Sequence, residues 1–208
     1  GTQRSGAVNR PDAAGLPGRV ITGILLAAGA GRRFGPDTQK LLATLPDGRR
    51  VIEAAAANLR AACGRVIAVA RRDPQLLETL RAAGCEVVIN ERADEGMGTS
   101  IAAGVAASPE TGGWLIALGD MPAIQPATIR AILGERPAED IIVVPAIDGR
   151  RGHPVRFAAC HGAALRALEG DRGARSVVER YAHHLVILET TDPGVLADID
   201  TPADLGRG

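Results

Sequence analysis

The chain has 208 residues, 46% of them hydrophobic and 2% aromatic, which is enough apolar material for one domain with a single aliphatic core. Its 24 Lys and Arg residues balance its 24 Asp and Glu residues, and this neutral net charge excludes the broad basic surface that binds nucleic acids. Because no apolar run approaches the ~20 residues that span a bilayer and no N-terminal segment resembles a signal peptide, we expect a cytoplasmic protein without a membrane partner.

The first 18 residues are rich in Gly, Pro and polar side chains and have no apolar period, which predicts a disordered leader or a cloning remnant before a single domain at 19–208. From residue 19 onward, short β-branched runs alternate with Ala- and Leu-rich stretches of helical spacing. Over the first half, this pattern predicts strands at 20–26, 65–70, 85–89 and 114–118 and helices at 51–62, 74–83, 99–107 and 126–134.

The second half continues the alternation. We predict strands at 141–146, 185–190 and 195–200, a turn into a short strand within 149–157, helices at 160–169 and 173–182, and a helix start at 201–204. The three cysteines, Cys63, Cys85 and Cys160, are widely spaced and odd in number, which favours reduced core thiols over disulfides or a metal site. The alternation as a whole is typical of an α/β protein with a mostly parallel sheet covered by helices.

A glycine-rich segment, AAGAGRRFG at 27–35, follows the first predicted strand. Successive backbone N–H groups in such a turn can converge on an anion, but its glycines fit neither the Walker A loop nor the dinucleotide-binding spacing. Arg32, Arg33 and Lys40 follow within a dozen residues and offer the cations that a triphosphate requires. The segment therefore predicts a phosphate loop, with solvated surface cations as the alternative, above all for Arg32.

Three aspartates are candidate metal ligands. Asp120 comes directly after the apolar run 114–118 and Gly119, at a strand's carboxyl end, where open α/β sheets bind their ligands. Asp198 and Asp200 occupy alternate positions of the last predicted strand, so both could face the same side. We predict that Asp120 and Asp200 hold Mg²⁺, with Asp198 as the alternative second ligand. The competing role for Asp200 is to cap the helix that begins at the following Thr-Pro pair.

Small residues mark a second segment, EGMGTS at 95–100, at the predicted entrance of a helix. They would let a planar base or a ribose approach the backbone closely. Capping of the helix by Thr99 or Ser100 is the alternative.

Polar clusters in the second half are candidates for binding an anionic acceptor. His153 lies in Gly-His-Pro and, with Arg150 and Arg151, forms a compact group of hydrogen-bond donors, although a lone loop histidine is more often structural or exposed. Asp171 lies in a polar turn before the helix predicted at 173–182, where helix capping is its simplest role.

Together, these motifs resemble those of the molybdenum cofactor cytidylyltransferase branch of the molybdopterin nucleotidyltransferases. They stand in the family's order: LLAAGAGRRFG followed by Lys40, then EGMGTS, LGDMP, GRRGHPVRF, EGDRGAR and DIDTPADL, spanning residues 24–205. The resemblance implies a Rossmann-like nucleotidyltransferase fold, three-layer α/β/α with a mixed, mostly parallel sheet. It also implies an NTP-binding first half at about 19–125 and an acceptor-binding second half at about 126–205.

The resemblance implies roles for individual residues. Arg33, Lys40 and Asp120 would be catalytic, Asp120 and Asp200 would bind Mg²⁺, and the acceptor would lie near Arg151, His153 and Asp171. The residues expected to contact the nucleotide are Leu26, Ala27, Ala28, Gly29, Gly31, Arg33, Lys40, Gly96, Gly98, Thr99 and Ser100.

The implied reaction is transfer of CMP from CTP to molybdopterin with release of pyrophosphate. CTP is favoured because Leu-Ala-Ala-Gly at 26–29 stands where guanylyltransferase relatives have Leu-Ala-Gly-Gly, and Gly-His-Pro at 152–154 points the same way. A molybdenum hydroxylase is a candidate client of the product. The alternatives are GTP as the donor, another phosphorylated acceptor, and a non-catalytic carrier or chaperone of the cofactor.

Overall fold

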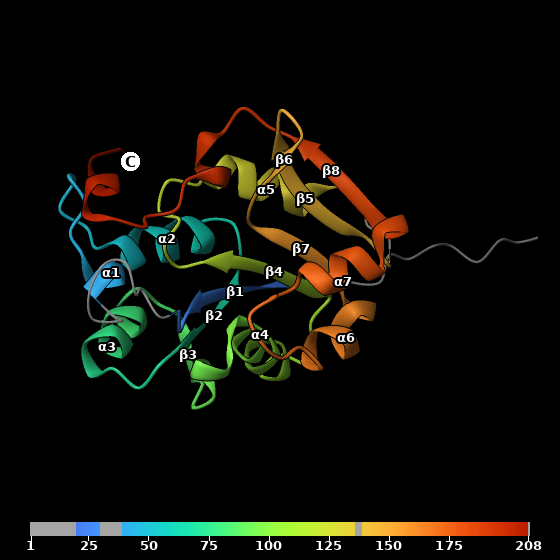
Figure 1. The fold of residues 1–208 in the computed structure, drawn as a ribbon, viewed down its shortest axis with the longest axis horizontal. Helices are drawn as coiled ribbons and strands as arrows, with labels where there is room; N and C mark the ends of the chain where they lie inside the picture. The colour runs from blue at the N-terminus through green and yellow to red at the C-terminus, as the bar shows by residue number, and fades with distance from the viewer. Residues whose placement is uncertain (1–19, 30–38, 136–138, 208) are drawn as a thin grey trace, which may run out of the picture.

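The computed structural model describes residues 20–29, 39–135 and 139–207, and Figure 1 shows a central sheet with helices against it on both sides. The strands are β1 (Ile21–Ala27), β2 (Arg65–Ala70), β3 (Glu86–Ile89), β4 (Gly113–Leu118), β5 (Ile142–Ile147), β6 (Arg150–Arg151), β7 (Val155–Ala158) and β8 (Leu185–Glu189). The α-helices are α1 (Gln39–Leu42), α2 (Val51–Arg60), α3 (Pro74–Ala82), α4 (Met97–Ala106), α5 (Pro126–Gly134), α6 (Gly162–Arg166) and α7 (Arg175–Arg180). Short 3-10 helices are η1 (Ala93–Glu95), η2 (Ala159–His161), η3 (Ala182–His184), η4 (Pro193–Leu196) and η5 (Pro202–Arg207).

The sheet is mixed. Its strand order is β3-β2-β1-β4-β7-β5-β6, with β8 paired to β5. β1 runs parallel to β2 and β4, β2 runs parallel to β3, and β5 runs parallel to β8. β7 is antiparallel to both β4 and β5, and β6 is antiparallel to β5. The prediction of a mixed, mostly parallel sheet is confirmed.

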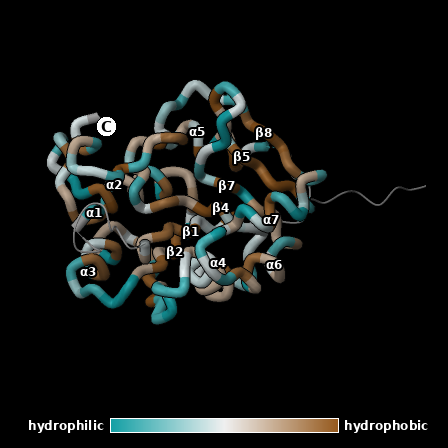
Figure 2. Tube along the Cα trace, in the orientation of Figure 1, coloured by the Kyte–Doolittle hydropathy of each residue, from teal (hydrophilic) through white to brown (hydrophobic). Residues whose placement is uncertain are grey.

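Apolar side chains form one core on each face of the sheet. Along β1, Leu25 packs in the core that includes residues of α2, α3 and α5, whereas Ile24 and Leu26 pack in the core that includes residues of α4, α6 and α7. This division follows from the alternation of side chains along a strand. Figure 2 shows the hydrophobic strands enclosed by helices that carry hydrophilic segments. The three-layer α/β/α arrangement is confirmed.

The last predicted strand is wrong. Residues 193–196 form η4, and the chain from there to η5 has no regular structure. Its backbone bonds to neighbouring loops instead of a ladder, since Ile199 N donates to Asp120 O at 2.9 Å. The helices predicted at 160–169 and 173–182 are also shorter than expected, since α6 covers Gly162–Arg166 and α7 covers Arg175–Arg180. Between them, Gly170 and Gly173 have φ of 66° and 55°, outside the helical range.

The cysteines divide between core and surface. Cys63 and Cys85 are buried, as predicted, and burial raises the pKa of both thiols to about 11. Cys160 is exposed, so the prediction of a core thiol is wrong there, because η2 carries it to the surface. All three are free thiols. None of the helices in the described ranges has the length and apolar character to cross a membrane.

Candidate functional site

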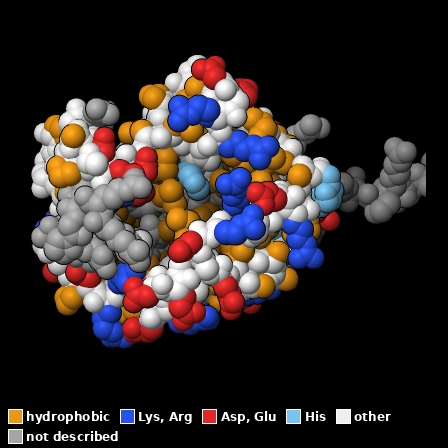
Figure 3. Space-filling model, viewed as in Figure 1, with side chains coloured by type: hydrophobic (Ala, Val, Ile, Leu, Met, Phe, Trp, Pro, Cys, Tyr) orange, Lys and Arg blue, Asp and Glu red, His pale blue; other side chains and the backbone are white. Residues whose placement is uncertain are grey.

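A cavity of about 440 Å³ lies at the carboxyl ends of β1, β2 and β4. These strands are parallel and end together, with Ala27 beside Ala70 and Leu26 beside Leu118. The residues that follow them therefore meet at one edge of the sheet. Figure 3 shows a hollowed face of the molecule, with hydrophobic side chains inside the hollow and Lys and Arg side chains along one side of it.

One ammonium group joins two carboxylates at the edge of this cavity, whose lining includes Lys40 and Asp120. Lys40 in α1 places its Nζ 2.7 Å from Asp120 Oδ2 and 3.2 Å from Asp200 Oδ1. Burial by itself lowers the pKa of Lys40, but the hydrogen bonds and negative charges of Asp120 and then Asp200 outweigh it and raise this pKa above its usual value. The lysine is therefore a permanent cation at neutral pH, brought by the fold to carboxylates 80 and 160 residues away in the sequence.

Backbone contacts fix the loop that carries Asp120. Gly119 N donates to Leu26 O at 2.9 Å, and a side chain at Gly119 would meet Ile52 at 2.8 Å. Asn58 Nδ2 donates to Pro122 O at 2.8 Å, and Asp120 O accepts from the backbone of the segment that carries Asp200. The loop that carries Asp120 is thus hydrogen-bonded to the segment that carries Asp200, which holds the two carboxylates close together.

The pair of carboxylates fits a divalent metal. Asp120 and Asp200 direct oxygens at one point that already carries a cation, and Asp120 lines the cavity. No group of three or more His, Cys, Asp or Glu side chains suited to a metal gathers within the described ranges. The protein therefore offers two oxygen ligands, and water and phosphate oxygens would complete the octahedron that Mg²⁺ prefers.

The structure separates Asp200 from Asp198. The Asp200 side chain is half-exposed and contacts Lys40, whereas Asp198 is exposed and buried Ile199 lies between them. The capping role belongs to another residue, because Asp204 Oδ2 accepts from the N–H groups of Asp200 and Thr201 at 3.2 and 2.8 Å. The geometry therefore favours Asp200 as the second ligand.

The glycines of the 95–100 segment are close to protein backbone. A side chain at Gly96, whose φ is 116°, would meet Gly170 C at 2.3 Å, and one at Gly98 would meet Glu169 O at 2.7 Å. Gly98 N also donates to Gly170 O at 2.8 Å. The lack of side chains at these two glycines thus lets the 169–171 loop pack closely against the segment. The sequence did not indicate this role for the glycines.

The two hydroxyls of this segment do not cap α4 within the described structure, since the N-cap residue is Gly96 and has no side-chain bond. Thr99 Oγ1 instead contacts the carbonyl oxygens of Arg92 and Gly96, both at 2.9 Å. Ser100 lines the cavity.

The predicted nucleotide-binding residues fall into three groups. Those that line the cavity are Leu26, Ala28, Gly29, Lys40, Gly96 and Ser100. Those that are buried and absent from the cavity lining are Ala27, Gly98 and Thr99. Gly31 and Arg33, together with Arg32, lie outside the described residues.

The Gly-His-Pro segment is held by the loop after β8. Gly152 N donates to Pro145 O at 2.8 Å, His153 N donates to Val195 O at 2.9 Å, and a side chain at Gly152 would clash with Val195 O at 2.1 Å. Burial lowers the pKa of His153, while the charges of Asp120 and Asp198 act in the opposite direction. His153 Nδ1 is buried without a hydrogen-bond partner among the described residues.

The other predicted acceptor residues are at the surface. Arg150 and Arg151 are exposed on β6, and Asp171 is exposed and lines the cavity. The N-cap residue of α7 is Ala174 and not Asp171, so the capping alternative for Asp171 is wrong.

Sequence reasoning missed two residues beside the cavity. Arg71 lines it, donating from Nε to Ala28 O at 2.8 Å and from Nη1 to Asp94 Oδ1 at 2.6 Å. Asn90 donates from Nδ2 to the hydroxyls of Thr99 and Ser100. Both directly follow predicted strands, so the rule that singled out Asp120 could have found them.

Known proteins share this fold and much of this sequence. The family model described as the MobA-like NTP transferase domain matches residues 23–185. Nicotine blue oxidoreductase of Paenarthrobacter nicotinovorans is 31% identical over 201 residues, which cover 90% of this chain and 95% of the relative.

Three solved structures are also similar. Rv0371c from Mycobacterium tuberculosis H37Rv is 29% identical with a TM-score of 0.75, covering 93% of this chain and 100% of that one. Its manganese complex is 30% identical with a TM-score of 0.67, covering 89% of this chain and 95% of that one. A nucleotidyl transferase from Methanothermobacter is 27% identical with a TM-score of 0.75, covering 89% and 94% of the two chains.

Proposed function

The chain belongs to the MobA-like NTP transferase family and is a nucleotidyltransferase, and from this premise we propose that it transfers CMP from CTP to molybdopterin and releases pyrophosphate. The observation that carries this proposal is the convergence of Lys40, Asp120 and Asp200, from three separate segments, at a cavity on the carboxyl edge of the sheet. Such a cluster suits a triphosphate and its metal.

The nucleotide occupies the part of the cavity built by the first half, about 19–125. The β1 turn at Ala28 and Gly29 forms one side of it and Ser100 another. Arg33 and Lys40 neutralise the triphosphate, and Gly31 gives its backbone N–H, as the resemblance implies. The Leu-Ala-Ala-Gly sequence at 26–29 supports CTP over GTP.

Asp120 and Asp200 hold Mg²⁺, which supplies electrostatic stabilisation to the phosphate oxygens when it is bound. The manganese complex of the mycobacterial relative supports a divalent metal in this fold. The protein itself aligns the reactants, and the ammonium of Lys40 offsets the charge that develops on the leaving pyrophosphate.

In the transfer step, a terminal phosphate oxygen of the acceptor bonds to the α-phosphorus of CTP. The bond from that phosphorus to the oxygen bridging to the β-phosphate breaks, and pyrophosphate leaves with the electron pair. The attacking phosphate is already anionic, so no side chain has to remove a proton from it.

The acceptor lies against the second half, about 126–205. Arg151 supplies positive charge from the exposed surface of β6, Asp171 lines the cavity, and His153 presents an imidazole whose pKa is lowered by burial, so that it is neutral at pH 7. A neutral imidazole can accept as well as donate a hydrogen bond, which suits the mixed donors and acceptors of a pterin.

One experiment can separate the alternatives to this reaction. GTP could replace CTP, another acceptor could replace molybdopterin, and the oxidoreductase name of the relative that is 31% identical makes a redox reaction the second candidate. A carrier that passes the cofactor to a molybdenum hydroxylase would bind the cofactor without turnover.

The test is pyrophosphate release from CTP and from GTP with Mg²⁺, with and without molybdenum-loaded molybdopterin. We expect release only with CTP and the cofactor together. Release with GTP and not with CTP would show that GTP is the nucleotide donor. No release with either nucleotide from folded protein would contradict the proposed transfer and leave another acceptor, the carrier or a redox reaction in its place.

A further inference from the structure

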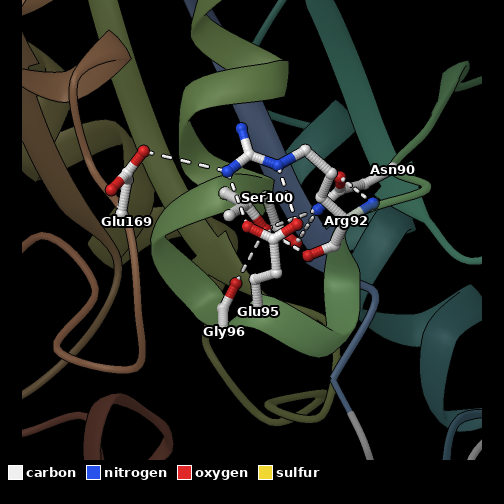
Figure 4. A network of polar contacts seen from close by, with 7 residues as sticks. Asn90, Arg92, Glu95, Gly96, Ser100 and Glu169 are labelled. Atoms are coloured by element: carbon white, nitrogen blue, oxygen red, sulfur yellow. Dashed lines mark hydrogen bonds and ion pairs between the residues drawn. The ribbon is translucent and has the colours of Figure 1, made fainter.

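Asn90, directly after β3, has a determinate hydrogen-bond orientation. It is 8% exposed, and its Oδ1 accepts from Arg92 N at 3.0 Å. A backbone N–H can only donate, so the atom facing it must be the amide oxygen. The Nδ2 group of Asn90 therefore faces the opposite way, toward α4 (Figure 4).

The amide nitrogen of Asn90 meets two hydroxyls. Nδ2 lies 2.9 Å from Thr99 Oγ1 and 2.9 Å from Ser100 Oγ. Since Nδ2 can only donate, both hydroxyl oxygens must accept from it. Each hydroxyl then has its own proton left to donate elsewhere.

The two protons have different destinations. Thr99 donates to the carbonyl oxygen of Arg92 or of Gly96, both at 2.9 Å. For Ser100, which is buried on the cavity wall, the described residues provide no acceptor. Its proton is therefore available to a molecule in the cavity.

We propose that Asn90 is a positioning residue that makes the Ser100 hydroxyl a hydrogen-bond donor to a neutral acceptor atom of the nucleoside part of the substrate. This role depends on the nucleotide site proposed above. It adds Asn90 to that site and makes the Ser100 hydroxyl the donor, and not the acceptor, of its hydrogen bond to the nucleotide.

The charges around the cavity place the nucleoside, and not the triphosphate, at Ser100. α4 belongs to the core on one face of the sheet, and Asp94 and Asp171 line the cavity near its start. Lys40 lies in α1, whose Leu41 packs in the core on the other face. Arg71, which also lines the cavity, is paired with Asp94 at 2.6 Å. Phosphates are therefore stabilised near the lysine and destabilised near Asp171, which leaves the base and ribose for Ser100.

The experiment measures the Kd of CTP, of 2′-deoxy-CTP and of inorganic triphosphate by calorimetry with the full chain. The variants are S100A, N90D and N90D/S100A. We expect S100A to weaken CTP binding about fivefold to tenfold, the usual effect of one lost neutral hydrogen bond. Binding of inorganic triphosphate should stay within about twofold, because that probe carries no nucleoside.

N90D exchanges the donor and acceptor in the hydrogen bond between residues 90 and 100. A carboxylate at this position accepts from the Ser100 hydroxyl and draws its proton away from the cavity. The negative charge added by N90D affects CTP binding to the same extent whether residue 100 is Ser or Ala. Comparing the effect of N90D in these two backgrounds therefore cancels this contribution. We expect N90D to cost at least about threefold more in CTP affinity when Ser100 is present than in the S100A background.

Ser108 provides a matched control just beyond the end of α4. Its buried hydroxyl accepts from Trp114 Nε1 at 2.9 Å and contacts Gly104 O at 3.1 Å, and it does not line the cavity. S108A should lower the Tm and leave the Kd of CTP unchanged. A purely structural role for Ser100 would make S100A behave in the same way.

The outcomes are separable. An S100A penalty that persists with 2′-deoxy-CTP assigns the acceptor atom to the base or to another ribose oxygen, and one that disappears assigns it to the ribose 2′ oxygen; both support the inference. Unchanged CTP binding by S100A, equal loss of inorganic triphosphate, or additive effects of N90D and S100A overturn it. Failure of the wild-type protein to bind either CTP or GTP overturns the proposed function, and this inference with it.

Discussion

Lys40 occupies the position that a metal ion would also favour. Its Nζ lies between the carboxylates of Asp120 and Asp200, which are partly shielded from water. Two carboxylates this close would repel each other if no cation lay between them. The lysine therefore stabilises the site before substrates bind, and a divalent metal must compete with it or displace it.

This competition predicts opposite effects of one substitution. K40M removes the internal cation, so the nucleotide-free protein should bind Mn²⁺ more tightly, by about tenfold for one lost competing charge. Turnover should fall, because the leaving pyrophosphate loses a cation. Electron paramagnetic resonance of Mn²⁺ measures the affinity and pyrophosphate release measures the rate. Weaker Mn²⁺ binding by K40M would show that Lys40 assembles the site without competing for it.

Asp120 should contribute more to rate than to folding. D120N keeps the shape of the side chain and removes its charge, and we expect turnover to fall by about 100-fold or more. D198N tests the alternative ligand, and we expect it to lower turnover less than D120N does, because Asp198 is exposed whereas Asp120 is paired with Lys40. Full activity of D120N at low Mg²⁺ would contradict the metal assignment.

At the scale of elements, α4 and the 169–171 loop form a joint between the two halves of the chain. Gly98 N donates to Gly170 O at 2.8 Å, and neither Gly96 nor Gly98 has room for a side chain beside this loop. The segment predicted to contact the nucleotide is thereby held against the loop that brings Asp171 to the cavity.

Two helical glycines should respond in opposite ways to alanine. At Gly98 in α4, a Cβ would lie 2.7 Å from Glu169 O, so G98A should destabilise the fold by about 1–3 kcal/mol despite the better helix propensity of Ala. At Gly134 in α5, a Cβ would have no described neighbour within 4 Å, so G134A should be neutral or stabilising by up to about 1 kcal/mol. Urea denaturation of both variants checks this. Equal stability of G98A and wild type would mean that the 169–171 loop shifts freely.

At the scale of the whole molecule, buried histidines link stability to pH. Burial lowers the pKa of His153, beside the cavity, and of His161, in η2. His161 Nε2 lies 2.8 Å from Asp140 O, and the Asp140 carboxylate and the rings of Tyr181 and His184 are close to it. Both histidines are therefore neutral in the folded protein near pH 7.

The sign of the pH effect follows from these shifts. Below the usual histidine pKa of about 6.5, the unfolded chain binds protons that the folded chain does not, so the free energy of unfolding falls as the pH falls through this window. We expect urea midpoints to be lower at pH 5.5 than at pH 7.5, with a smaller difference in H161N. A midpoint that rises on acidification to pH 5.5 would contradict the lowered pKa values.

The sequence by itself determined the fold class, the family and most of the elements. Local patterns carried that information: the alternation of β-branched runs such as 65–70 with helical stretches such as 126–134 is visible within a few residues, and both ranges match β2 and α5. Asp120 was found in the same way, because its position after an apolar strand and before Pro122 is a local signal.

Only the tertiary structure decided which distant residues meet. It brought Lys40 to Asp120 and Asp200, left Asp198 exposed, replaced the strand expected at 195–200 by η4 and loop contacts, and assigned the glycines at 96 and 98 to packing against the 169–171 loop. These features depend on hydrogen bonds and close contacts between segments up to 160 residues apart, whose partners leave no periodic or compositional trace in either segment. A chain's local pattern decides which elements form, whereas the packing of those elements decides which of its polar side chains share a site.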